Sequence, residues 1–134
     1  MMIDHREHYP EKDGVFWRYE SCCTFSEAGD VYASIFITVW IKAADTPRGC
    51  WVIPANQRYM LRNDKWRKLN RRDRKLIIIG TRRRWAYPTK AEAWTSFRRR
   101  LSWREAHWNT EGRRIAALKE LVEQEGNNAR FDKL

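Results

Sequence analysis

The chain is 134 residues long, carries a formal net charge of +10, and contains eight tryptophans, five tyrosines and five phenylalanines. A chain of this length forms one domain with a real hydrophobic core and needs neither metal ions nor disulfides to stabilise it. No signal peptide is recognisable, and no apolar run approaches the roughly 20 residues that cross a bilayer, so we expect a soluble, cytoplasmic protein without a membrane partner. The cysteines Cys22, Cys23 and Cys50 lack a Cys-x-x-Cys spacing and fit a reducing compartment.

Positive charge is concentrated in the middle of the chain. Residues 58–104 carry 17 lysines and arginines against 3 acidic residues, a net charge of +14, whereas residues 1–57 have −3 and residues 105–134 have −1. Charge that serves solubility alone is normally mixed in sign along the chain. A segment this basic concentrates polyanions near the protein, which predicts a phosphate-bearing partner.

The first 13 residues are charged and aperiodic, and we expect them to form a flexible arm. His5 and His8 are spaced so that they could bind a metal from one helix face, but no further ligand lies nearby, and we predict no metal site. A single domain is expected over residues 14–126, followed by a C-terminal tail at residues 127–134.

Two long strands are predicted at the start of the domain. In residues 15–25, apolar side chains such as Val15, Trp17 and Tyr19 alternate with polar ones, which is the pattern of a half-buried strand. Residues 31–41 alternate more cleanly, because every odd position is aliphatic and every even position is polar or aromatic. A five-residue turn that contains Gly29 separates them, so we predict an antiparallel hairpin.

Shorter elements follow the hairpin. Residues 50–53 and 76–80 have the composition of short buried strands, and a fourth strand is expected at residues 58–62. Residues 64–75 crowd basic side chains too closely for a clear pattern, and they are interpreted as a basic loop or a single helical turn. Residues 81–87 are extended and are expected to continue the strand before them or to pair with it.

A long amphipathic helix is predicted over residues 89–125. Thr89 is a natural N-cap, and Glu92 completes a capping box. Large apolar residues recur at every seventh position, namely Trp94, Leu101, Trp108, Ile115 and Val122. A continuous helix here would be about 54 Å long, which exceeds the width of so small a domain. Either the helix is kinked near Asn109, or its second half packs against another copy, and we expect a homodimer through this helix.

The expected fold class is therefore α+β, with an antiparallel sheet of four to five strands over residues 15–87 followed by the long C-terminal helix. No Gly-x-Ser-x-Gly, Walker or His-Glu-x-x-His motif is present, so we predict no catalytic residues and no cofactor. One class of enzyme stays open on composition alone. Ribosome-dependent RNase toxins build their sites from Arg, Lys and Tyr and need no histidine.

Arginine grips phosphate with two parallel hydrogen bonds, and aromatic rings stack on bases. One set of such residues precedes the predicted helix start, where free backbone N–H groups also attract anions. A second set lies on the outer face of the helix if the side of Trp94 and Phe97 is buried. The predicted ligand-binding residues are Arg82, Arg83, Arg84, Trp85, Tyr87, Lys90, Arg99 and Trp103.

The alternative for these residues is structural. Trp85 and Tyr87 would then be core residues beneath the helix, and the arginines beside them would only be solvated. Trp103 would be covered by residues 64–75 instead of facing a partner.

Two stretches carry a resemblance: the helix start at residues 85–93 (Trp-Ala-Tyr-Pro-Thr-Lys-Ala-Glu-Ala) and the turn at residues 46–51 (Thr-Pro-Arg-Gly-Cys-Trp). They are similar to a group of small bacteriophage-encoded proteins of unassigned function, in which an N-terminal sheet precedes an Ala-Tyr-Pro-Thr-Lys helix start and a basic helix. The likeness covers about residues 15–105, and the basic insertion at residues 64–80 departs from it. It implies a phage origin, the host cytoplasm and an accessory role, and it carries over no site residues.

Three functions remain open. The first, which we expect, is a non-enzymatic phage accessory protein in counter-defence that binds a nucleic acid or a cyclic-nucleotide signal through its basic, aromatic-rich surface. The second is a protein–protein inhibitor of a host nucleic-acid-binding or defence complex. The third is the RNase toxin.

Overall fold

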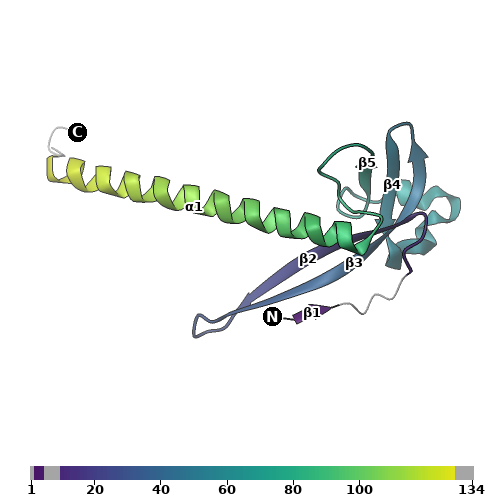
Figure 1. The fold of residues 1–134 in the computed structure, drawn as a ribbon, viewed down its shortest axis with the longest axis horizontal. Helices are drawn as coiled ribbons and strands as arrows, with labels where there is room; N and C mark the ends of the chain where they lie inside the picture. Colours follow the sequence, from purple (N-terminus) through teal and green to yellow (C-terminus); the bar gives the residue numbers. More distant parts are fainter. Residues whose placement is uncertain (1, 5–9, 129–134) are drawn as a thin grey trace. The chain divides into compact units, whose positions relative to one another are not determined.

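The computed structural model describes residues 2–4 and 10–128. They form an α+β fold in which a mainly antiparallel sheet precedes one long helix, as the sequence predicts (Figure 1). The elements in chain order are β1 (Met2–Asp4), β2 (Val15–Phe25), β3 (Val31–Thr46), β4 (Gly49–Pro54), the 3-10 segment η1 (Ala55–Lys68), β5 (Lys75–Ile78) and α1 (Lys90–Asn128).

β2 and β3 form the predicted hairpin and pair antiparallel along the whole of β2 (Figure 1). Gly29 lies in the turn with a φ of 88°, a left-handed conformation that glycine adopts without strain. The register places the odd-numbered side chains of both strands on one face. The odd positions at residues 15–19 and 35–41 are buried there, as the alternation predicts, whereas those at residues 21–25 and 31–33, near the turn, are exposed.

β3 is the central strand of the sheet. β2 pairs with one of its edges, while β1 and β4 pair one after the other with the opposite edge, β1 in parallel and β4 antiparallel. β5 then pairs antiparallel with β4. β1 lies inside the segment expected to be a flexible arm. His5 and His8, the histidines of that segment, are outside the described residues.

The prediction of a strand at residues 58–62 is wrong, because these residues belong to η1. Within η1, Asn63 and Asp64 have φ angles of 56° and 54°. Asn and Asp tolerate this left-handed conformation better than most residues. The chain therefore turns, and Trp66 is buried against β3 and β4. η1 ends at Lys68, and the residues from 69 to 74 form turns and irregular loop structure. Residues 64–75, for which the sequence allowed either a basic loop or a helical turn, therefore contain the end of a helical segment followed by a basic loop.

The segment at residues 81–87 crosses the sheet instead of extending it. Tyr87 pairs with Trp17 of β2, with N···O distances of 2.6 and 2.9 Å, and this is an isolated bridge. Ala86 is buried with Trp40 on the even-numbered face of β3. The second half of β3 is therefore covered on both faces, by residues 81–87 on one and by η1 on the other.

The start of α1 confirms the predicted cap. The backbone N–H of Glu92 donates to Thr89 Oγ1 at 3.2 Å, and the Thr89 hydroxyl donates to Glu92 Oε1 at 3.0 Å. The first two turns pack on the sheet through Ala93 and Phe97. Among the described residues, no helix is long and apolar enough to span a membrane.

The chain divides into two compact units, Met1–Phe97 and Arg98–Leu134. In the second unit the described residues, 98–128, are the remainder of α1, and the helix continues through residues 109–112 without the kink that the sequence left open (Figure 1). Most of its described side chains are exposed, including the large apolar residues at positions 101, 108, 115 and 122.

Candidate functional site

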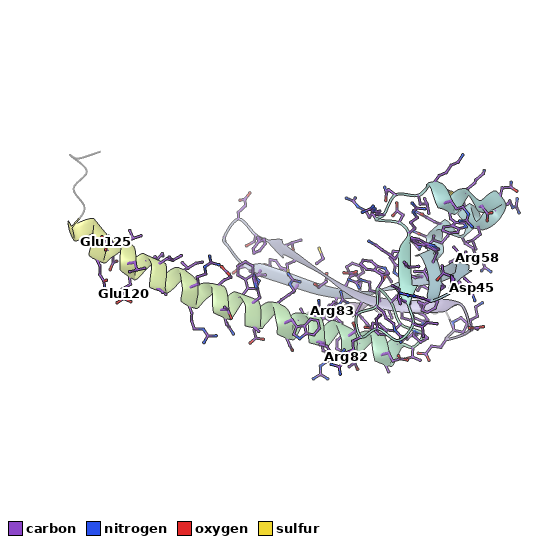
Figure 2. The ribbon with its side chains drawn as sticks, turned by 90° about the horizontal axis from the view of Figure 1, so that it is seen from above. Asp45, Arg58, Arg82, Arg83, Glu120 and Glu125 are labelled. Carbon is purple, nitrogen blue, oxygen red and sulfur yellow. The ribbon has the colours of Figure 1, made fainter. Side chains whose placement is uncertain are left out.

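The predicted residues Arg82, Arg84 and Tyr87 lie together in one hydrogen-bonded loop. The Tyr87 hydroxyl donates to the Arg82 carbonyl at 3.0 Å, and the Arg84 side chain donates from Nε to the Thr81 carbonyl at 3.2 Å. Arg82 and Arg83 have exposed side chains, and Figure 2 shows them away from Arg58. Tyr87 thus holds the loop in shape, while Arg82 extends into solvent.

Trp85 is half-buried and has several intramolecular contacts. Its ring meets Trp40 edge to face, with centroids 5.4 Å apart. The Arg18 guanidinium lies 3.6 Å and the Lys75 ammonium 4.3 Å from the centroid of the Trp85 ring, both within the range of cation–π attraction. Arg18 also donates to the Trp85 carbonyl at 2.8 Å and pairs with Glu20. Trp85 is therefore fixed against the sheet.

The helix N-terminus already has an anionic partner within the chain. The Lys90 backbone N–H donates to Glu11 Oε1 at 2.9 Å, so a carboxylate occupies the position that a phosphate would take. The Lys90 ammonium lies 4.6 Å from the centroid of the Trp17 ring. The backbone N–H and the ammonium group of Lys90 thus both have partners within the chain at the start of α1.

Arg99 and Trp103 belong to the second unit. Arg99 is exposed and Trp103 is 47% exposed, as the helix geometry predicts for an outer face. They form a separate candidate from the residues of the first unit.

The first unit contains a groove of about 1050 Å³ beside the even-numbered face of β3. Three aromatic side chains line it: Phe36 and Trp40 from β3, and Trp85 from the crossing loop. Phe36 is the most accessible of them at 36% exposure, whereas Trp40 is 6% exposed. The volume and the aromatic lining suit a flat organic group such as a nucleobase.

One wall of this groove comes from the most basic part of the chain. Arg72 and Lys75 line it, together with the acidic residues Asp73 and Glu20. Glu20 is paired with Arg18. The lining of the groove therefore combines three aromatic side chains with the cations Arg72 and Lys75.

Exposed basic residues are also frequent in the part of the chain that precedes Lys75. We name the following residues the basic segment: Arg58, Arg62, Lys65, Lys68, Arg71 and Arg72. No ion pair or hydrogen bond of their side chains is found within residues 2–4 and 10–128. By contrast, Arg67 lies over Trp66, and Arg74 donates to the Arg67 carbonyl at 2.9 Å.

Sequence reasoning missed most of the groove. The even positions of residues 31–41, which are polar or aromatic, could have indicated a binding face on this strand. The hairpin register then places Arg18 opposite Thr38 and Glu20 opposite Phe36. Lys75 could not be assigned in this way, because it reaches Trp85 only through the folding of the loop.

Among the described residues, no group of three or more His, Cys, Asp or Glu side chains is placed to hold a metal ion. Cys50 is buried, and burial raises the pKa of its thiol. Cys22 and Cys23 are exposed and free.

Comparisons with protein-family models, curated proteins and solved structures give no match for this chain.

Proposed function

We propose that this protein binds single-stranded nucleic acid, with bases in the aromatic groove and the phosphate backbone along the basic segment. The observation that carries this proposal is that Arg72 and Lys75 line the same groove as Phe36, Trp40 and Trp85. Nucleic acid presents flat rings and phosphates in alternation, which is the chemistry that this arrangement can contact.

The electrostatics favour a polymer over a single nucleotide. The basic segment extends from residue 58 to residue 72, and its cations have no partner among the described residues. A group of cations without partners in the described part of the chain gains most from a ligand that carries many phosphates, since each contact releases condensed counterions from the nucleic acid. A cyclic nucleotide would use the groove and leave most of these cations unused.

The aromatic lining favours a single strand over a duplex. Bases in a duplex are stacked on each other, whereas a single strand can place a base on an exposed ring. Phe36 supplies the accessible ring, and Trp85 is held in position by Arg18 and Lys75. A fixed ring loses less conformational freedom on binding than a mobile one.

The proposal assigns different roles to the residues predicted from the sequence. Trp85 contacts the ligand, and Arg82 offers an additional phosphate contact. Tyr87 and Lys90 support the loop and the helix start. The binding is non-enzymatic, and a role in counter-defence would follow from a phage origin.

Fluorescence anisotropy with labelled oligonucleotides tests the proposal. We expect single-stranded DNA or RNA to bind more tightly than duplex DNA, with affinity falling steeply as salt rises. Phe36→Ala removes the accessible ring and should weaken binding by about 5- to 150-fold, the equivalent of about 1–3 kcal/mol of stacking. The matched control is Phe25→Ala, because Phe25 is 73% exposed on the same hairpin but does not line the groove.

Equal binding by the two phenylalanine variants would exclude the groove. Tight, salt-insensitive binding of cyclic nucleotides without oligonucleotide binding would replace the proposed ligand with a small signal molecule.

A further inference from the structure

The second unit presents an apolar seam along one side of α1. The seam contains residues at heptad a positions, Leu101, Trp108, Ile115 and Val122, and Leu118 at a d position. Their exposed fractions range from 41% to 70%. A helix in water draws most of its stability from packing of such a face, so this seam requires a partner surface.

The spacing identifies the kind of partner. A repeat of seven residues keeps the same face in contact only when two helices supercoil around each other. A second copy of α1 offers the same spacing over the same length. We propose that the protein forms a homodimer in which residues 101–118 of α1 pair with the same residues of the partner's α1 in antiparallel orientation. This proposal is independent of the proposed nucleic-acid binding.

The charged residues in the seam determine the orientation. Arg104 and Glu111 take the two d positions between Leu101 and Leu118. A parallel pair would place Arg104 beside the partner's Arg104, and Glu111 beside the partner's Glu111. Both contacts bring like charges together. Reversing one helix removes both repulsions.

The antiparallel register follows from the apolar ends of the seam. When Leu101 faces the partner's Leu118, each layer of the helix pair combines a residue at heptad position a of one helix with a residue at heptad position d of the other. Arg104 then lies one layer, about 6 Å along the axis, from the partner's Glu111. Symmetry repeats this contact, so the dimer contains two opposite-charge pairs flanked by leucine layers. Arg104 and Glu111, the two charged residues that interrupt the apolar seam, thus both form contacts in the dimer.

Sedimentation equilibrium of the full chain over a series of concentrations tests the dimer. Ile115→Lys, which puts a charge into the seam, should weaken the dimer at least about tenfold. Ala117→Lys is the matched control, because Ala117 lies outside the a and d positions of the same turn. Far-UV circular dichroism checks that both variants keep the helix. A wild-type protein that is monomeric at every concentration, or equal dimers in both variants, would refute the proposal.

Charge exchange tests the orientation. Arg104→Glu and Glu111→Arg should each weaken the antiparallel dimer about tenfold, because each creates two like-charge contacts. The double variant Arg104→Glu/Glu111→Arg should recover the wild-type dissociation constant to within about twofold. In a parallel dimer, each single exchange replaces one like-charge pair by another and changes little. Single variants that dimerise as well as wild type would therefore contradict the antiparallel arrangement.

Discussion

Trp85 meets Trp40 edge to face, with ring centroids 5.4 Å apart and ring planes at 86°. Trp40 belongs to the central strand, and Trp85 lies in the loop that leads to α1. The contact therefore joins the loop to the sheet and also forms part of the groove wall. One pair of rings contributes both to the stability of the fold and to the shape of the candidate binding site.

Replacing Trp85 with alanine should affect stability through this contact. The variant loses the Trp40 contact and the attraction of Arg18 and Lys75 to the ring, and we expect the free energy of unfolding to fall by about 2–4 kcal/mol. Tyr59→Ala is the control, since Tyr59 is 70% exposed and should change stability by less than about 0.5 kcal/mol. Urea titrations measure both. A similar small change in both variants would show that Trp85 is not anchored as described.

Gly49 tests the contact between β4 and β5. A Cβ atom at this position would lie 1.8 Å from the Ile77 carbonyl oxygen, an overlap that only a backbone shift can relieve. Gly49→Ala should therefore destabilise the protein by about 3 kcal/mol or more. Gly112→Ala, at a helical position with no atom within 4 Å, should stabilise it by about 0.5–1 kcal/mol. Thermal denaturation should therefore show a lower melting temperature for Gly49→Ala and a higher one for Gly112→Ala than for wild type.

Thr89 tests the cap of α1. Thr89→Ala removes the acceptor for the Glu92 backbone N–H and should reduce stability by about 1 kcal/mol. Thr95 is the matched control, because it lies inside the helix, where its hydroxyl donates to the Ala91 carbonyl and caps no backbone N–H group. We expect Thr95→Ala to change the unfolding free energy by less than about 0.5 kcal/mol. If both substitutions cost the same, the cap contributes nothing specific.

The buried titratable groups predict loss of stability at alkaline pH. Burial raises the pKa of the Cys50 thiol and of the Tyr19 hydroxyl. Both groups keep their protons to higher pH in the folded protein than in the unfolded chain. Their contribution to stability is complete below the unfolded pKa and is lost as pH rises through the folded pKa. The urea midpoint should therefore decline above about pH 8.5, the ordinary pKa of a thiol.

Cys50→Ala isolates the thiol from the other groups. It removes one of the groups that bind more protons in the folded state, so its urea midpoint should fall less between about pH 8.5 and pH 10 than that of wild type. The comparison uses slopes, because the substitution itself leaves a small cavity. Parallel declines in both proteins would assign the pH dependence to other groups.

Elements with a local signal were predictable from the sequence. The alternation identified the core face over residues 35–41 but not at residues 31–33, which are exposed, and Thr89 with Glu92 identified the helix start. The strand expected at residues 58–62 failed because burial of Trp66 and the left-handed residues Asn63 and Asp64 outweighed local propensity.

The candidate site depends more on contacts between distant residues. Glu11 reaches the Lys90 backbone across 79 positions, and Arg18 reaches the Trp85 carbonyl across 67. No periodicity encodes such pairs. Sequence reasoning therefore found the right residue types around Trp85, but it could not tell which of them hold the loop and which line the groove.

The most direct test of the proposed function is the salt dependence of oligonucleotide affinity in two charge-matched double variants. Arg71→Ala/Arg72→Ala removes two members of the basic segment, and Arg98→Ala/Arg99→Ala removes an equal charge from α1. If the basic segment contacts phosphates, the first variant should bind more weakly than wild type. The slope of log affinity against log salt should become shallower by about 1.4, while the second variant keeps the wild-type slope. An unchanged slope in the first variant, or the loss appearing only in the second, would contradict the proposed site.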